Sequence, residues 1–222
     1  QPESLRRCIT GRLDQANGSA KLAGLKLEPI RLRTSPHVRL IGCGTALNAC
    51  KIGQLAIESL ARIPAVAHVA SEFRYNDPVI NTNAIHFAVS QSGETADTLS
   101  AVKEIQLKGG DVHGIINVVG STIARLCGRG VYIHSGPEQA VASTKAFTNM
   151  VAALLLFAMR MGRTRSFSRE KGRSIVKQFG KIPDLMEKYL ANQGPIDEAV
   201  ELVKDAKCVL FLGRGLSAPV AS

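Results

Sequence analysis

The sequence predicts an α/β fold built on a doubly wound, five-stranded parallel sheet with helices on both faces. Through the middle of the chain, apolar runs rich in β-branched residues alternate with segments of helical period, which is the pattern of successive βαβ units. The apolar runs are nearly continuous rather than alternating, as expected for strands that are covered on both faces. We therefore expect a three-layer, flavodoxin-like domain.

Five segments carry the strand pattern in the order of the chain. They are VRLIGC (38–43), AVAHVAS (65–71), AIHFAVS (84–90), VHGIINVV (112–119) and GVYIH (130–134). Helical segments are predicted between most of them. One has Ala96, Leu99, Val102 and Ile105 in steps of three, and another ends before Pro64.

The segments that flank the sheet have helical patterns. Residues 1–35 predict short helical pieces broken by glycines, 144–162 one long apolar helix, and 168–205 two helices separated near 192–195. The longest apolar run, from Met150 to Met159, is about half of the roughly 20 residues that a membrane-spanning helix needs. We expect this run to form a buried core helix, and no contact with a membrane.

The end of the chain repeats a motif from its first third. CVLFLGRGLSAP (208–219) has the same arrangement as VRLIGCGTALNA (38–49), an apolar strand followed by Gly-x-Gly. We interpret the match as a duplicated α/β unit, of which Ser222 leaves only the first strand. The predicted organisation is an N-terminal helical segment (1–35), a first α/β domain (36–164), a helical linker (165–205) and the start of a truncated second domain (206–222).

Composition argues against several functional classes. The net charge of +10 comes from the flanks, and the most basic stretch, 160–181, has few aromatic side chains to stack on bases. Nucleic-acid binding is therefore not expected. The five cysteines are odd in number and contain no C-x-x-C pair, which favours neither a disulfide framework nor a zinc site and indicates a reducing cytoplasm. The chain starts at Gln1 rather than Met, so a targeting segment is left open.

Three loops are expected at the edge where the parallel strands end, which is where open α/β sheets bind ligands. They are the turn 42–45, the loop 90–95 and the stretch 138–145. Helix starts offer free N–H groups to an anion, and hydroxyls donate to phosphate oxygens without adding charge. We expect Ser92 to be a helix N-cap. Taken singly, each loop also fits a purely structural role.

Motifs for other chemistries are missing. Leu47 stands where the dinucleotide fingerprint needs its third glycine, and neither a P-loop nor a G-x-S-x-G elbow occurs. The best acids near the sheet edge, Glu72 and Glu138, fit ordinary carboxylates at helix starts equally well. The histidines His68, His86 and His113 lie within apolar runs and predict core positions. No metal site and no cofactor are expected.

Four strings carry a family resemblance: CGTA (43–46), ASEFRY (70–75), SQSGETADTL (90–99) and VASTKAFT (141–148). They resemble the sugar-isomerase (SIS) domain and, more narrowly, the isomerase half of the glutamine–fructose-6-phosphate aminotransferases. That family makes glucosamine 6-phosphate, and its isomerase half has two SIS domains, in agreement with the repeat. The resemblance implies that the sugar phosphate is held by Ser90, Gln91, Ser92 and Thr95, and that the sugar is lined by Cys43, Gly44, Thr45, Val141 and Ser143, with Lys145 nearby.

The resemblance also implies a partner and a limit. The expected ligand is fructose 6-phosphate, glucose 6-phosphate or glucosamine 6-phosphate, bound by a cytoplasmic homodimer paired through its SIS domains. Ala46 stands where many family members have serine. The glutaminase domain is absent, and the family's catalytic glutamate, histidine and C-terminal lysine are expected beyond Ser222. We therefore assign no catalytic residue. The alternative is a stand-alone SIS module that senses a sugar phosphate.

Overall fold

A parallel sheet of five strands forms the centre of the computed structural model, which describes residues 1–139 and 143–222. In chain order its strands are β3 (Val38–Gly42), β4 (Ala65–Val69), β5 (Ile85–Ser90), β6 (Val112–Ile116) and β7 (Gly130–Tyr132). They are arranged in the sheet as β4-β3-β5-β6-β7. This order confirms the predicted doubly wound, flavodoxin-like sheet.

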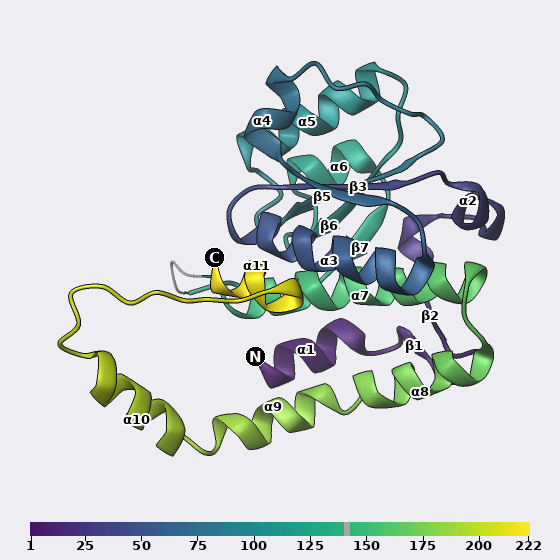
Figure 1. Cartoon of the computed structure of the whole chain (residues 1–222). Helices are drawn as coiled ribbons and strands as arrows, with labels where there is room; N and C mark the ends of the chain where they lie inside the picture. The colour runs from purple at the N-terminus through teal and green to yellow at the C-terminus, as the bar shows by residue number, and fades with distance from the viewer. Residues whose placement is uncertain (140–142) are drawn as a thin grey trace.

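Helices cover both faces of the sheet (Figure 1). One face carries α4 (Ala70–Tyr75), α5 (Ala96–Leu107) and α6 (Thr122–Cys127), and the other carries α3 (Thr45–Ala61) and α7 (Lys145–Arg165). Successive strand residues point to opposite faces. In β3, Leu40 packs into the core on the α3–α7 side, and its neighbour Ile41 packs into the core on the α5 side. Both sides are apolar, which explains the nearly continuous apolar strands.

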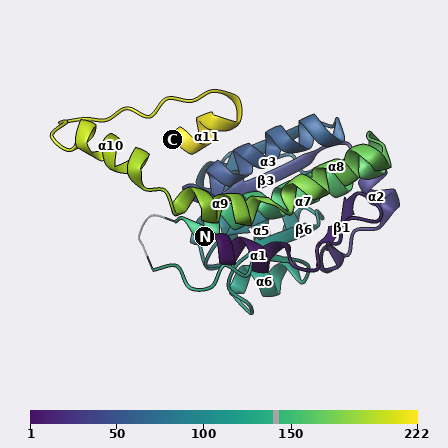
Figure 2. The same ribbon diagram turned by 90° about the horizontal axis from the view of Figure 1, so that it is seen from below.

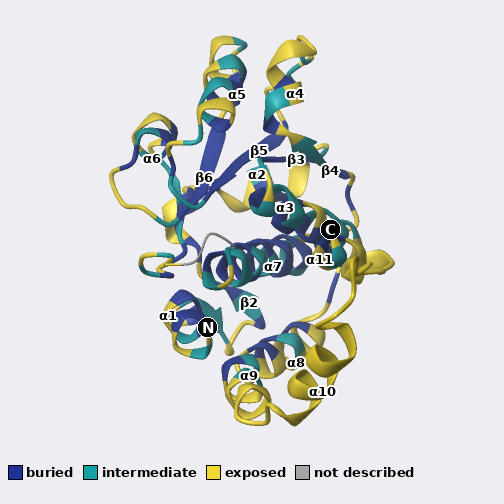
Figure 3. Ribbon diagram, turned by 90° about the vertical axis from the view of Figure 1, so that its left-hand side faces the viewer, coloured by how far each residue is buried: buried dark blue, intermediate teal, exposed yellow. Residues whose placement is uncertain are grey.

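Helix α7 is the predicted core helix, and it is buried along most of its length (Figure 3). A further layer lies against it, formed by α1 (Pro2–Ile9), α8 (Arg169–Phe179) and α9 (Ile182–Leu190) (Figure 2). The buried Asn149 amide of α7 donates to the Ser4 carbonyl at 3.1 Å and to the Ile133 carbonyl at 2.9 Å. One polar side chain therefore ties α7 both to the N-terminal helix and to the end of β7.

The N-terminal segment contains an element that the sequence did not predict. Besides α1, the 3-10 helix η1 (Ala23–Leu25) and α2 (Pro29–Thr34), it forms a short antiparallel pair of β1 (Leu13–Asp14) and β2 (Ser19–Ala20). Gly18 in the turn has φ +59°, and a Cβ there would lie 2.7 Å from the backbone of Gly172. Glycine at this position lets α8 pack directly on the turn.

The sequence predicted two helices over residues 168–205, and this number is wrong. The structure has three: α8, α9 and α10 (Gly194–Val203). The break near 192–195 is confirmed, but a second break falls at Gly180 and Lys181. Pro183, at the second position of α9, has no N–H to donate to Phe179, so one continuous helix is disfavoured there.

The strand predicted at 208–212 is not formed. Residues 208–214 have neither helical nor strand structure, and Phe211 is 75% exposed. An isolated apolar segment has no neighbouring strand to accept its backbone hydrogen bonds, so it cannot form a ladder. The chain then forms η2 (Gly215–Ser217) and α11 (Ala218–Ala221), where the Ser222 hydroxyl lies 3.1 Å from the Asn48 amide oxygen of α3. The second α/β unit stays a prediction.

No helix within the described residues is long and apolar enough to cross a membrane.

Two buried histidines make stability depend on pH. His86 and His113 are 0% and 2% exposed, as expected for core histidines. Burial lowers the pKa of each to about 4. Their pKa in the unfolded chain is about 6.5. Below pH 6.5 these two imidazoles therefore bind protons in the unfolded chain but stay neutral in the native state. As a result, the free energy of unfolding falls as the pH is lowered from 6.5 to about 4. The slope approaches about 1.4 kcal/mol per pH unit for each histidine.

Urea unfolding at pH 7 and at pH 5 measures this effect. We expect a clear loss of unfolding free energy at pH 5, and a smaller loss in the double variant His86→Gln/His113→Gln. Equal unfolding free energies of the unsubstituted chain at the two pH values would contradict the burial of neutral imidazoles.

Candidate functional site

The strand order places a topological switch point at the carboxyl edge of the sheet, between β3 and β5. From β3 the chain moves outward to β4 and then returns to the other side of β3 as β5. The loops that follow β3 and β5 therefore diverge, and open α/β sheets bind their ligands at such a switch point. The predicted turn 42–45 follows β3, and the predicted loop 90–95 follows β5. The two loops thus flank the switch point.

The loop after β5 is organised by the hydroxyl of Ser90, which is 2% exposed. Its oxygen accepts a hydrogen bond from the Gly93 amide at 3.0 Å and lies 3.1 Å from the Thr95 hydroxyl. Gly93 has φ +68°, and a Cβ there would lie 2.0 Å from the Ser121 hydroxyl. Glycine is therefore required both by the backbone conformation and by the close approach of α6.

Ser92 is not the N-cap that the sequence predicted. Helix α5 begins at Ala96 with Thr95 as its N-cap, and the Ser92 hydroxyl accepts instead from the Glu94 amide at 3.2 Å. The Thr95 hydroxyl makes no capping bond, since it lies against Ser90. The first N–H groups of α5 are thus left without a side-chain cap, and they are free to meet an anion.

The loop is also fixed to α6. The Glu94 carboxylate accepts from the Thr122 amide at 2.8 Å, and the Gly93 carbonyl accepts from the Ile123 amide at 2.9 Å. The bond from Thr122 lowers the pKa of Glu94. This carboxylate therefore serves the start of α6.

The turn after β3 contains a second required glycine. Gly44 has φ +53° and ψ −127°, and α3 begins at the next residue, Thr45. The Cys43 thiol is half-buried and accepts a hydrogen bond from the Thr98 hydroxyl of α5 at 3.9 Å. Thr98 is fully buried, so it links the β3 turn to the helix that follows the 90–95 loop.

The third predicted stretch leads into α7. The Glu138 carboxylate accepts from the Thr144 amide at 3.3 Å and from the Ala146 amide at 3.1 Å, so it satisfies free donors at the helix start. Ser143 and Lys145 are half-buried beside it. Val141 lies outside the described residues. Among the described residues, no hydrogen bond joins Ser143 or Lys145 to the 90–95 loop.

A cavity of about 590 Å³ lies beyond the ends of β5, β6 and β7. Its wall includes Gln91, which the family resemblance implies is a phosphate ligand, and Glu138 from the third stretch. The other lining residues are Arg7, Asn117, Val118, His134, Gly136 and Pro137. Gln91 therefore shares one cavity with the segment that follows β7.

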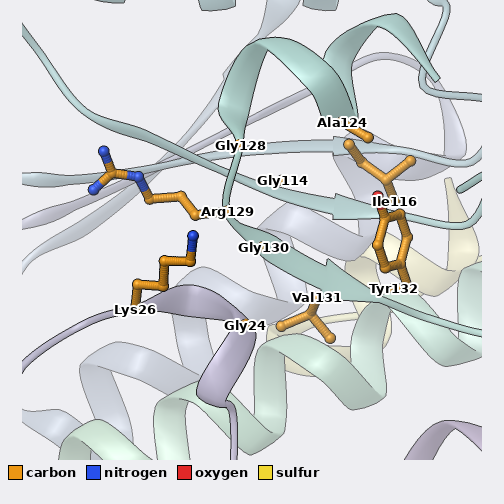
Figure 4. A pocket seen from close by; sticks show the side chains of 10 residues that line it. All are labelled: Gly24, Lys26, Gly114, Ile116, Ala124, Gly128, Arg129, Gly130, Val131 and Tyr132. Carbon is orange, nitrogen blue, oxygen red and sulfur yellow. The ribbon is translucent and has the colours of Figure 1, made fainter. Parts of the chain in front are cut away.

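A second cavity, of about 340 Å³, lies at the outer edge of the sheet along β7 (Figure 4). Glycines from η1, β6 and β7 form much of its wall, and the side chains of Lys26 and Arg129 lie at one end. None of the predicted site residues lines it. No group of histidine, cysteine, aspartate or glutamate side chains in the described ranges is placed to hold a metal ion.

Two residues around the switch point escaped the sequence analysis. Thr98 looked like an ordinary helix residue one turn beyond the loop, and its bond to Cys43 has no local signature. Asn117 follows β6 and bonds to the segment after β7, which the sequence did not indicate. A polar residue directly after a buried strand was the only available signal.

Known proteins share both the sequence and the fold. The SIS domain family matches residues 31–160. The glutamine–fructose-6-phosphate aminotransferases of Chlorobaculum tepidum and Thermus thermophilus are each 41% identical to this chain over its whole length, and the chain spans 36% of their length. The C-terminal domain of the Francisella tularensis glucosamine-fructose-6-phosphate aminotransferase superposes with a TM-score of 0.89 at 31% identity, covering 100% of this chain and 62% of that one.

These similarities confirm the resemblance read from CGTA, ASEFRY, SQSGETADTL and VASTKAFT. The family match covers more than half of the chain, and the superposition extends it to both flanks. The chain belongs to the SIS domain family, and within that family its similarity is to the isomerase part of the glutamine–fructose-6-phosphate aminotransferases.

Proposed function

We propose that this chain binds a hexose 6-phosphate at the carboxyl edge of its sheet, as part of an enzyme that makes glucosamine 6-phosphate from fructose 6-phosphate and glutamine. The observation that supports this most directly is the position of the 42–45 and 90–95 loops on either side of the β3–β5 switch point. Ser90, Gln91, Ser92 and Thr95 hold the phosphate in this proposal. Cys43, Gly44, Thr45, Val141 and Ser143 line the sugar, with Lys145 nearby.

The chemistry of the loop suits a phosphate group. Three hydroxyls lie within one short loop, and the uncapped start of α5 adds backbone N–H groups and the positive end of the helix dipole. The carboxylate within the loop, Glu94, accepts a hydrogen bond from the Thr122 amide of α6, so its negative charge is engaged there. A dianion therefore meets donors of partial positive charge.

The same proposal covers the whole protein. The described cysteines are all unpaired, in keeping with a reducing cytoplasm. We keep the division into segments 1–35, 36–164, 165–205 and 206–222, and a homodimer formed through SIS domains. In this organisation the exposed apolar residues 208–212, which form no strand here, belong to the start of a second SIS unit.

Binding is expected without turnover. The sugar reaction needs a base within reach of a carbon-bound proton. Glu138 already accepts from the Thr144 and Ala146 amides at the start of α7, and the imidazole of His134 is exposed to solvent. Donors on the phosphate act at a distance from the reacting carbons, so they give affinity rather than chemistry.

The first prediction concerns the ligand. Fructose 6-phosphate and glucose 6-phosphate should shift the backbone amide signals of residues 90–96 in a ¹⁵N-correlated NMR titration, and NAD should not, because Leu47 replaces the glycine that dinucleotides require. Shifts caused by NAD alone would reject the sugar-phosphate assignment.

The second prediction separates two serines of the loop. Ser92→Ala removes a hydroxyl that caps no helix, so the melting temperature should change little while fructose 6-phosphate binds about tenfold more weakly, the worth of one charge-assisted hydrogen bond. Ser90→Ala should also destabilise the fold, by about 1 kcal/mol, because it frees the Gly93 amide.

The matched control for both variants is Ser100→Ala, in the second turn of α5. Thr98 is unsuitable as a control, because its hydroxyl donates to the Cys43 thiol. Unchanged affinity in Ser92→Ala would show that its hydroxyl does not contact the phosphate.

The third prediction concerns activity. The 222-residue chain should form no glucosamine 6-phosphate from fructose 6-phosphate with either glutamine or ammonia, as followed by chromatography of the products. Formation of product with ammonia would show that a base has been missed. Glu72→Gln and Glu138→Gln would then be the first variants to assay. His134→Ala would follow, since His134 and Glu138 line the cavity beside Gln91.

A further inference from the structure

The side chain of Asn117 connects the end of β6 to the segment that follows β7. Its amide oxygen accepts from both the backbone amide and the hydroxyl of Ser135, each at 2.8 Å. Its amide nitrogen donates to the Gly136 carbonyl at 2.8 Å. The oxygen and the nitrogen of this side chain are thus both engaged by two consecutive residues.

The backbone of Asn117 faces the other way, toward the predicted phosphate loop. Its N–H donates to the Gln91 carbonyl at 3.2 Å. A single residue therefore contacts the loop after β5 through its main chain and the segment after β7 through its side chain. Gln91, Asn117 and Gly136 all line the cavity of about 590 Å³.

The segment after β7 does not follow a relaxed extended path. His134 and Gly136 have φ +50° and φ +70°, and Ser135 between them is fully buried. A left-handed conformation is unfavourable for histidine and persists only where surrounding contacts hold it. The three hydrogen bonds between the Asn117 side chain and residues 135 and 136 supply such contacts. At its far end, the segment is fixed by Glu138 at the start of α7.

We propose that Asn117 is a positioning residue that holds Ser135–Glu138 at a fixed distance from Gln91, so that the phosphate end and the sugar end of the site keep their spacing. The ligand part of this inference rests on the proposed function. The residue itself need not touch the sugar. It acts through Glu138, whose carboxylate accepts from the Thr144 and Ala146 amides on either side of Lys145.

The test compares Asn117→Ala with Ser135→Ala and with the control Asn83→Ala. Asn83 precedes β5 and lies at the opposite edge of the sheet. Fructose 6-phosphate and inorganic phosphate are titrated separately into each ¹⁵N-labelled chain. Asn117→Ala leaves the phosphate loop intact. It should therefore lower the affinity for fructose 6-phosphate by about tenfold and the affinity for inorganic phosphate by less than about twofold.

Ser135→Ala removes only one of the three bonds and should give a smaller loss of the same kind, so the proposal does not depend on one variant. Asn83→Ala should change neither affinity. Equal weakening of both ligands, or no weakening in Asn117→Ala, would overturn the proposal, because a spacing role must affect the larger ligand selectively.

Amide hydrogen exchange separates this inference from the proposed function. Asn117→Ala should speed the exchange of the Ser135 amide relative to Asn83→Ala, while strand amides of β3 and β5 keep their protection. Failure of the unsubstituted chain to bind either ligand would reject the proposed function, and the exchange data would still decide the role of Asn117. An unchanged exchange rate of the Ser135 amide in Asn117→Ala would overturn the positioning role of Asn117.

Discussion

The burial of α7 is the constraint on which the rest of the molecule depends. Its apolar residues lie between the sheet with α3 on one side and α1 with α8 on the other. At Gly53 of α3, a Cβ would lie 2.8 Å from Leu154, so the two helices are in close contact. Because α7 runs back along the sheet from its carboxyl edge, its first turn lies where the loops after the strands gather. A packing requirement thus places Ser143 and Lys145 at the proposed site.

The sheet could be predicted because burial on both faces leaves a strong pattern in the sequence. Each run, such as 85–90 in β5, is mostly apolar and buried, and the chain between runs has the period of a helix. The long helix followed from its apolar run for the same reason. The β1–β2 pair could not be predicted, because four residues are too few to show alternation and Gly18 signals only a turn.

The candidate site was predictable in place but not in detail. Strand ends fix which loops meet, and this follows from the order of the elements. The N-cap of α5 depends on where the backbone turns, which Gly93 decides by its left-handed φ and its contact with Ser121. The bonds from Thr98 to Cys43 and from Thr122 to Glu94 join residues that are 55 and 28 positions apart. Such pairs leave no local period in the sequence.

The polar contacts around the switch point serve two separate purposes. The side chains of Ser90, Glu94 and Glu138 accept hydrogen bonds from backbone amides of the loops and helix starts. Side chains used in this way fix the geometry of a site and are not free to transfer protons. What they leave open is backbone N–H groups and hydroxyls, which are good donors to a phosphate and poor bases. In the proposed function, the edge of this sheet therefore holds a charged ligand in place, and other residues bring the proton-transfer group to it.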